Sequence, residues 1–138
     1  MDVKAENEKK KEYLWGYQRE MRQMKRLEEE LAELRLSKMC PSVIQDGMPH
    51  ASGGGDLSGY MVQVDRLERK IQKARYKRIR KFKEIRDRIE RLEDENEKDV
   101  LAYRYILGKK WEDIAVKMGY TWQHIHRIHS NALENFKM

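Results

Sequence analysis

The sequence is poor in the residues that mark secreted proteins and most metal sites. It has one cysteine, Cys40, two prolines and eight glycines among 138 residues, and 9% of it is aromatic. A single thiol forms no internal disulfide and no zinc site by itself, which favours the cytoplasm. No stretch approaches the roughly 18 apolar residues of a membrane span, and the first dozen residues lack the apolar core of a secretory signal. We also find no catalytic constellation, so no enzyme is expected.

Charge is abundant and unevenly distributed. Charged residues make up 39% of the sequence, and the net charge is +6. Residues 66–91 hold 13 Lys and Arg against 4 Asp and Glu, a local balance of +9. Such a stripe is typical of a polyanion partner, nucleic acid first, although it also suits a merely solvated helix face. Its candidate phosphate contacts are Arg75, Lys77, Arg78, Arg80, Lys81 and Lys83.

Two apolar stripes with a spacing of three or four residues predict two long helices in the first 96 residues. The first stripe runs from Leu14 to Leu34, and its helix ends at Cys40, because a residue before proline leaves the helical region. The second stripe runs from Met61 to Leu92. The spacing of three or four residues is interrupted once near Arg78, and we expect the helix to bend there or to change the helix against which it packs.

A Gly-rich connection is expected between these helices, over residues 41–59. Asp56 or Ser58 is the candidate N-cap of the second helix. The triple glycine at 53–55 is not followed by the Gly-Lys-Ser/Thr of a phosphate-binding loop, so nucleotide binding is not indicated. Since neither helix has a core of its own, residues 1–96 are expected to form an antiparallel coiled-coil hairpin, closed within one chain or by a second copy.

Residues 97–138 show three short helical periods, separated by breaks at Gly108 and Gly119. Such short breaks force the helices into a compact, angled unit. Ala115 is small where two helices would cross, Gly119 stands where the turn needs a positive φ, and Thr121 stands at the N-cap of the last helix. The inward positions are Ile114, Met118, Ile125 and Ile128. The expected fold is therefore all-α, a helical hairpin followed by a tri-helical helix-turn-helix domain.

This segment resembles region 4 of sigma-70-type transcription factors, in the variant found in small phage and prophage regulators of Gram-positive bacteria. The resemblance covers about 40 residues; the hairpin is similar only loosely. No counterpart of the promoter-melting regions is present. The matching runs are Asp99-Val100-Leu101, Arg104-Tyr105, Gly108-Lys109, Trp111-Glu112-Asp113-Ile114-Ala115, Met118-Gly119-Tyr120-Thr121 and Ile128-His129 through Ala132-Leu133.

The resemblance implies that the helix starting near Trp122 lies in the major groove of double-stranded DNA. Arg127 would bind guanine and Gln123 would bind adenine, each in bidentate fashion. The implied base contacts are Trp122, Gln123, His126, Arg127 and Ser130. The implied phosphate contacts are Lys109, Lys110, Lys117, Thr121 and His124.

The last helix departs from the family in carrying histidines where Lys and Arg are common, which predicts weaker or pH-sensitive binding. Because His124, His126 and His129 do not share one helix face, no metal and no cofactor are expected. Three functions stay open. The chain is a transcription regulator that acts with RNA polymerase, a DNA-recognition subunit of phage packaging, or a coiled-coil protein-interaction adaptor. A homo-oligomer through the hairpin is compatible with each of them.

Overall fold

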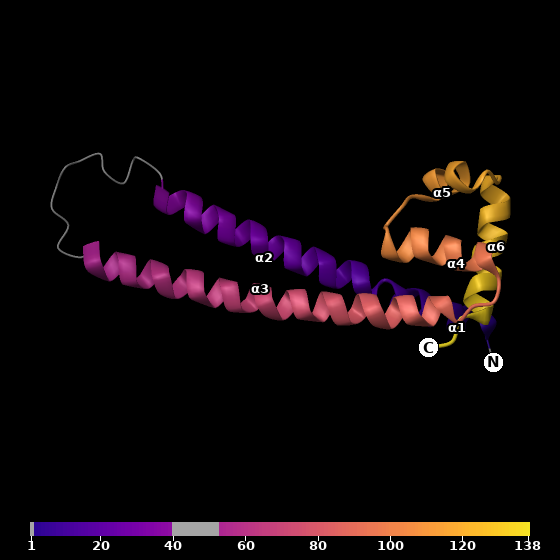
Figure 1. Cartoon of the computed structure of the whole chain (residues 1–138), viewed down its shortest axis with the longest axis horizontal. Helices are drawn as coiled ribbons and strands as arrows, with labels where there is room; N and C mark the ends of the chain where they lie inside the picture. The colour runs from indigo at the N-terminus through magenta and orange to yellow at the C-terminus, as the bar shows by residue number, and fades with distance from the viewer. Residues whose placement is uncertain (1, 40–52) are drawn as a thin grey trace. The chain divides into compact units, whose positions relative to one another are not determined.

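The computed structural model describes residues 2–39 and 53–138, and over these residues the fold is all-α, as expected (Figure 1). A long N-terminal helix is bent at Trp15 into α1 (Val3–Leu14) and α2 (Gly16–Met39), and it packs against α3 (Gly53–Glu90). Shorter helices follow. They are α4 (Glu95–Leu101), the π-helix η2 (Ala102–Ile106), α5 (Trp111–Met118) and α6 (Trp122–Asn135).

Contacts divide the chain into two compact units. Unit 1 comprises Met1–Glu20 and Arg78–Met138, and unit 2 comprises Met21–Lys77. The boundary between the units within α3 lies beside Arg78, where the regular spacing of apolar residues in the sequence is interrupted. The first twenty residues thus group with the C-terminal helices, whereas the sequence places them with the hairpin; the expected boundary between residues 96 and 97 stays a prediction.

In unit 2 the apolar stripes of α2 and α3 pack against each other within one chain. Among the described residues, ion pairs between Glu28 and Arg75 at 2.9 Å and between Arg35 and Glu68 at 2.8 Å join the helices. Because the later residue of α2 pairs with the earlier residue of α3, the helices run antiparallel. Exposed ion pairs contribute at most about 1 kcal/mol each, so most of the stabilisation comes from the buried side chains Met24, Leu27, Leu31, Ile71 and Ala74.

The second helix begins earlier than the sequence predicts. A connection was expected up to residue 59, with a cap at Asp56 or Ser58, but α3 already begins at Gly53. Glycine weakens a helix by about 1 kcal/mol relative to alanine, so local propensity disfavours this start. The first residues of α3 that pack on the core are Val64 and Leu67. The rest of the expected connection, residues 40–52, lies outside the described residues.

A substitution at Gly59 tests whether α3 begins as early as the structure shows. A Cβ added at Gly59 would meet no atom within 4 Å. Gly59→Ala should therefore raise the free energy of unfolding by about 0.5–1 kcal/mol, because alanine loses less backbone entropy in a helix. Urea unfolding followed by circular dichroism measures the change. Gly119→Ala, at a φ of 72°, is the control and should lower stability; a loss of stability at Gly59 would contradict the helical start.

Helix α1 belongs to the core of unit 1. Leu14 at its end is fully buried, as is Ile85 of α3, and Phe136 after α6 is nearly so. The ring of Tyr13 lies 6.0 Å from the ring of Phe136. The N-terminal and C-terminal ends of the chain therefore share one apolar core.

Lys10 of α1 caps the C-terminus of α6. The side chain is buried, and its Nζ donates to the carbonyl oxygens of Leu133 at 2.8 Å and Glu134 at 3.3 Å. The last carbonyls of a helix have no partner inside it, and a cation is favourable there because the helix dipole is negative at that end. Glu6 lies 3.9 Å from the same ammonium and adds a weak ion pair.

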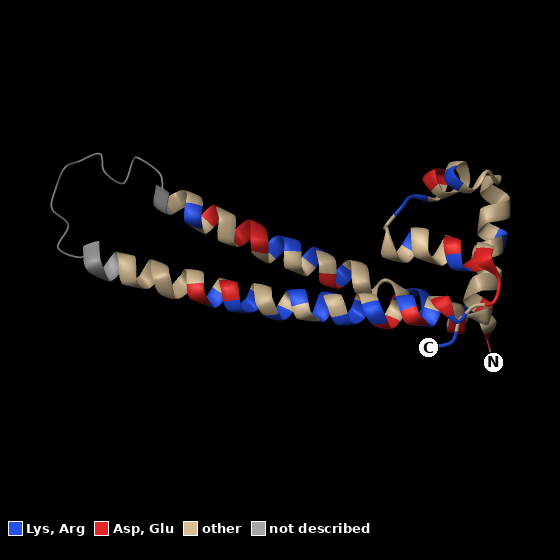
Figure 2. Cartoon of the chain, in the orientation of Figure 1, with Lys and Arg blue, Asp and Glu red and all other residues tan. Residues whose placement is uncertain are grey.

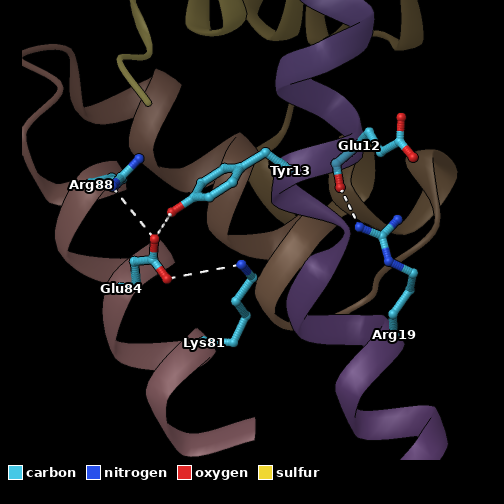
Figure 3. Close-up of polar contacts among 6 residues, drawn as sticks. All are labelled: Glu12, Tyr13, Arg19, Lys81, Glu84 and Arg88. Carbon is cyan, nitrogen blue, oxygen red and sulfur yellow. Dashed lines mark hydrogen bonds and ion pairs between the residues drawn. The ribbon is translucent and has the colours of Figure 1, made fainter. Parts of the chain in front are cut away.

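A polar cluster joins α1 to α3 near the bend (Figure 3). The Tyr13 hydroxyl donates to Glu84 at 2.9 Å, and Glu84 also pairs with Arg88 at 3.5 Å and Lys81 at 3.9 Å. Burial and the Glu84 carboxylate raise the pKa of Tyr13, so it stays a neutral donor. Gly16 lies beside this cluster, and a Cβ there would come within 2.6 Å of Lys81 Cε, so the flexible lysine side chain would have to shift.

Removal of the Lys10 ammonium should destabilise unit 1 selectively. A hydrogen bond to a charged group contributes about 1.5–3 kcal/mol, so we expect Lys10→Met to lower the free energy of unfolding by about that amount. Chemical denaturation monitored by Trp fluorescence tests this, because Trp15, Trp111 and Trp122 all lie in unit 1. Lys9→Met, at an exposed position of the same helix, is the matched control. Equal stability of the two variants would refute the capping role.

Candidate nucleic-acid interface

The turn between α5 and α6 is built by local residues. Gly119 ends α5 in the left-handed region at φ 72°. The Tyr120 amide donates to the Ala115 carbonyl at 3.1 Å, which closes the turn. Thr121 starts α6, and its hydroxyl oxygen accepts from the His124 amide at 3.1 Å. The expected positive φ at Gly119 and the expected cap at Thr121 are both confirmed.

The inner face of α6 packs on α4 and α5. Three of the four predicted inward residues, Ile114, Ile125 and Ile128, are buried together with Val100 of α4, and Met118 packs against them half-buried. Ala115 packs against the same cluster, so its small side chain lies at the helix contact. This core fixes which face of α6 points outward.

That outward face carries the predicted base contacts. Residues 122, 123, 126, 127 and 130 share one side of a helix with 3.6 residues per turn. Trp122, Gln123, Arg127 and Ser130 are exposed. His126 is half-buried, because its ring lies between Trp122 at 3.9 Å and Trp111 at 4.5 Å. Four polar or aromatic side chains are thus available to a ligand, and His126 supports one of them, Trp122.

The predicted phosphate contacts lie on α5, on its approach and at the start of α6. Lys110 and Lys117 are exposed, whereas Lys109 is half-buried and its carbonyl accepts from Arg104 at 3.0 Å. Thr121 is exposed, and its hydroxyl oxygen is already used as the cap. The ring of His124 is half-buried and lies edge-on to Tyr120 at 4.6 Å.

Lys and Arg are concentrated along α3 (Figure 2), but part of this charge is engaged within the chain. In unit 2, Arg75 pairs with Glu28. In unit 1, Lys81 pairs with Glu84, and its Nζ lies 5.0 Å from the Tyr13 ring centre. Arg78 is half-buried and Arg80 is exposed, and both also make contacts within the chain. Lys77 and Lys83 are exposed.

A buried Tyr–His pair lies beneath α6. The Tyr105 hydroxyl and His129 Nε2 are 2.8 Å apart, and both residues are buried. Burial, with smaller effects of Lys11, His126 and Arg104, lowers the pKa of His129 to about 4. Burial also raises the pKa of Tyr105. Both groups are therefore neutral at pH 7, and His129 serves the core, not a ligand.

This pair should make stability depend on pH. The folded pKa of His129 lies below its ordinary 6.5, so the unfolded chain binds the proton more tightly. The stabilisation is complete above about pH 6.5 and is lost as pH falls towards 4, by up to about 3 kcal/mol. His126, whose pKa is also lowered by burial, acts in the same direction.

Urea unfolding at pH 7.5 and pH 5 tests the effect of His129. Variant His129→Gln keeps a hydrogen-bonding side chain and should lose most of the pH dependence that the parent shows in this window. Variant His124→Gln changes a ring that does not belong to the buried pair and should keep it. Identical pH profiles for the parent and His129→Gln would refute the assignment.

A ladder of stacked side chains crosses unit 1 and ends on the outward face of α6. We define the ladder as Trp15, Arg104, Trp111, His126 and Trp122. The Arg104 guanidinium carbon lies 5.0 Å from the Trp15 ring centre and 4.6 Å from that of Trp111. The ring centre of His126 lies 4.5 Å from that of Trp111 and 3.9 Å from that of Trp122. The bend between α1 and α2 is thereby connected to the exposed Trp122.

The sequence did not predict the N-terminal residues that bind backbone carbonyls of η2 and α6. The Gln18 amide donates to the carbonyls of Tyr105 at 3.3 Å and Ile106 at 2.9 Å, and Lys10 caps α6. These contacts join residues about ninety to one hundred and twenty positions apart, and local spacing carries no signal for them. The π-helix η2 was equally unforeseen, and α4 begins at Glu95, with its cap at Asp94, slightly before the expected joint.

Among residues 2–39 and 53–138, no group of three or more His, Cys, Asp or Glu side chains could hold a metal ion. Over the same part of the chain, no helix combines the length and the apolar character needed to cross a membrane.

Comparison with known proteins adds no relative. No family model matches the chain, and neither a curated protein nor a solved structure is similar to it. The resemblance to region 4 of sigma-70-type factors therefore stays a prediction, and functional inference rests on the residues of the chain itself.

Proposed function

We propose that the chain is a sequence-specific DNA-binding transcription regulator. In this proposal α4, α5 and α6 act as a tri-helical helix-turn-helix, α6 enters the major groove, and α2 with α3 forms an antiparallel coiled coil. The observation that carries the proposal is the exposed face of α6, with Gln123 and Arg127 one turn apart behind a capped N-terminus. Helix-turn-helix proteins read bases with the N-terminal part of such a helix.

The chemistry of this face suits base edges. Arg127 has the planar fork that binds guanine O6 and N7, and the Gln123 amide matches adenine N6 and N7. Ser130 is a short donor and acceptor one turn further along the same face. The buried Ile125 and Ile128 on the opposite side hold these positions rigid.

Phosphate contacts would come from cations around α6. Lys110 precedes α5 and Lys117 lies in its last turn, and both are exposed. Phosphate contacts position a protein on the duplex without reading its sequence. Lys77 and Lys83, exposed on α3, supply further positive charge. The stripe cations that make contacts within the chain, Arg75, Arg78, Arg80 and Lys81, would first have to leave their partners.

The polymerase partner and the phage setting rest on the resemblance of residues 99–133 to region 4 of sigma-70-type factors. A coiled-coil adaptor is the second candidate. One observation favours it, because Leu57, Met61 and Val62 of α3 are large apolar side chains that are exposed. Exposed apolar surface of this kind marks protein interaction sites.

Selection of duplexes from a random pool, followed by affinity measurements over a salt series, tests the proposal. Arg127→Ala should lose about 1–3 kcal/mol of discrimination at one base pair and retain salt-dependent general binding. Lys117→Ala should weaken all duplexes alike and reduce the salt slope by about 1. Arg22→Ala, an exposed arginine of unit 2, is the control for the change in charge.

The outcomes separate the candidates. Failure of the parent protein to bind any duplex at low salt would exclude the DNA-binding function and leave the adaptor. Binding without sequence preference, equally strong in the Arg127 variant, would exclude base reading by α6.

A further inference from the structure

We infer that Trp122 is a specificity-determining residue that contacts the 5-methyl group of a thymine in the major groove. The inference rests on the proposed function and adds the kind of base that the first turn of α6 selects. Three observations carry it. They are the exposure of the Trp122 ring, the support beneath it and its position on the helix.

Trp122 is exposed, at 52% of the maximum for the residue, although it has one of the largest apolar side chains of unit 1. It is the first residue of α6 and follows the Thr121 cap directly. Among the five residues of the outward face it is the most apolar, since the others are Gln, His, Arg and Ser. An apolar surface is therefore presented at the end of the helix that enters the groove first.

The ring is also supported from behind. His126 lies one turn further along α6, with its ring centre 3.9 Å from that of Trp122, and Trp111 lies 4.5 Å beyond His126. Burial and the nearby Arg104 lower the pKa of His126, so the supporting ring is neutral at pH 7. Support of this kind restricts the Trp122 side chain before binding, which reduces the entropy lost in the complex.

The major groove limits what an indole can recognise. Base edges there present hydrogen-bond donors and acceptors, and the one methyl group among the four standard bases is that of thymine. Indole has a single donor and no acceptor, so it cannot form the bidentate pairs available to Gln123 and Arg127. The exposed face of Trp122 thus fits thymine, while its polar neighbours on α6 take the adjoining bases.

The experiment removes one methyl group from the DNA. Duplexes selected by the parent protein are resynthesised with deoxyuridine in place of each thymidine in turn, since uracil differs from thymine only by the missing 5-methyl. At one position the dissociation constant should rise about fourfold, the effect expected for one buried methyl group. Trp122→Ala should bind thymine and uracil duplexes equally at that position.

Two further variants distinguish contact from folding. Val116→Ala removes a highly exposed apolar side chain of α5 and should keep the full thymine preference. His126→Ala removes the support of Trp122 and should reduce the preference, with the helix content and unfolding midpoint monitored in parallel. Trp122→Phe keeps a smaller aromatic surface and should retain part of the preference, so a misfolded alanine variant does not decide the result.

The failure of this inference differs from the failure of the proposed function. If the parent selects a sequence but binds thymine and uracil equally at every position, or selects a site without any required thymine, the role of Trp122 is refuted and α6 remains a base reader. If the parent binds no duplex at all, the proposed function falls, and the inference falls with it.

Discussion

The position of Arg104 between Trp15 and Trp111 is the contact on which the rest of unit 1 depends. Its guanidinium stacks on one ring from the bend between α1 and α2 and on another from the first turn of α5, and it donates to the Lys109 carbonyl between them. Planar stacking is a property of arginine that lysine lacks. One side chain of η2 thereby fixes the N-terminal bend, the approach to α5 and, through Trp111, the packing under α6.

The C-terminal helices of unit 1 also receive contacts from the first twenty residues of the chain. Helix α5 has eight residues and α4 has seven, lengths at which an isolated helix is unstable in water. Their support comes from the other end of the chain, where Lys10 caps α6 and Gln18 satisfies the carbonyls of Tyr105 and Ile106. The folding unit around α6 is accordingly larger than the last forty residues that carry the sequence motif.

The sequence predicted the features that short-range chemistry determines. Apolar spacing indicated the α2–α3 pairing, and Gly119 and Thr121 were placed correctly, because a positive φ and an N-cap depend on one residue and its neighbours. It could not predict the start of α3 at Gly53, because three successive glycines have a low helix propensity and the local sequence favours a turn there. Nor could it indicate that Lys10 and Gln18 would bind backbone carbonyls, since a charged or amide side chain looks the same in sequence whether it is solvated or capping.

The net charge of +6 says little about α6 itself. Arg127 is the one Lys or Arg in that helix, and burial lowers the pKa of His126 and His129, so these rings add no positive charge at neutral pH. In a DNA complex, the electrostatic attraction would therefore originate outside α6, at Lys110, Lys117 and the exposed cations of α3. Sequence selectivity and general affinity for DNA would then belong to different elements. Because phosphate attraction weakens steeply with salt while base contacts do not, discrimination between DNA sequences would be clearest at moderate ionic strength.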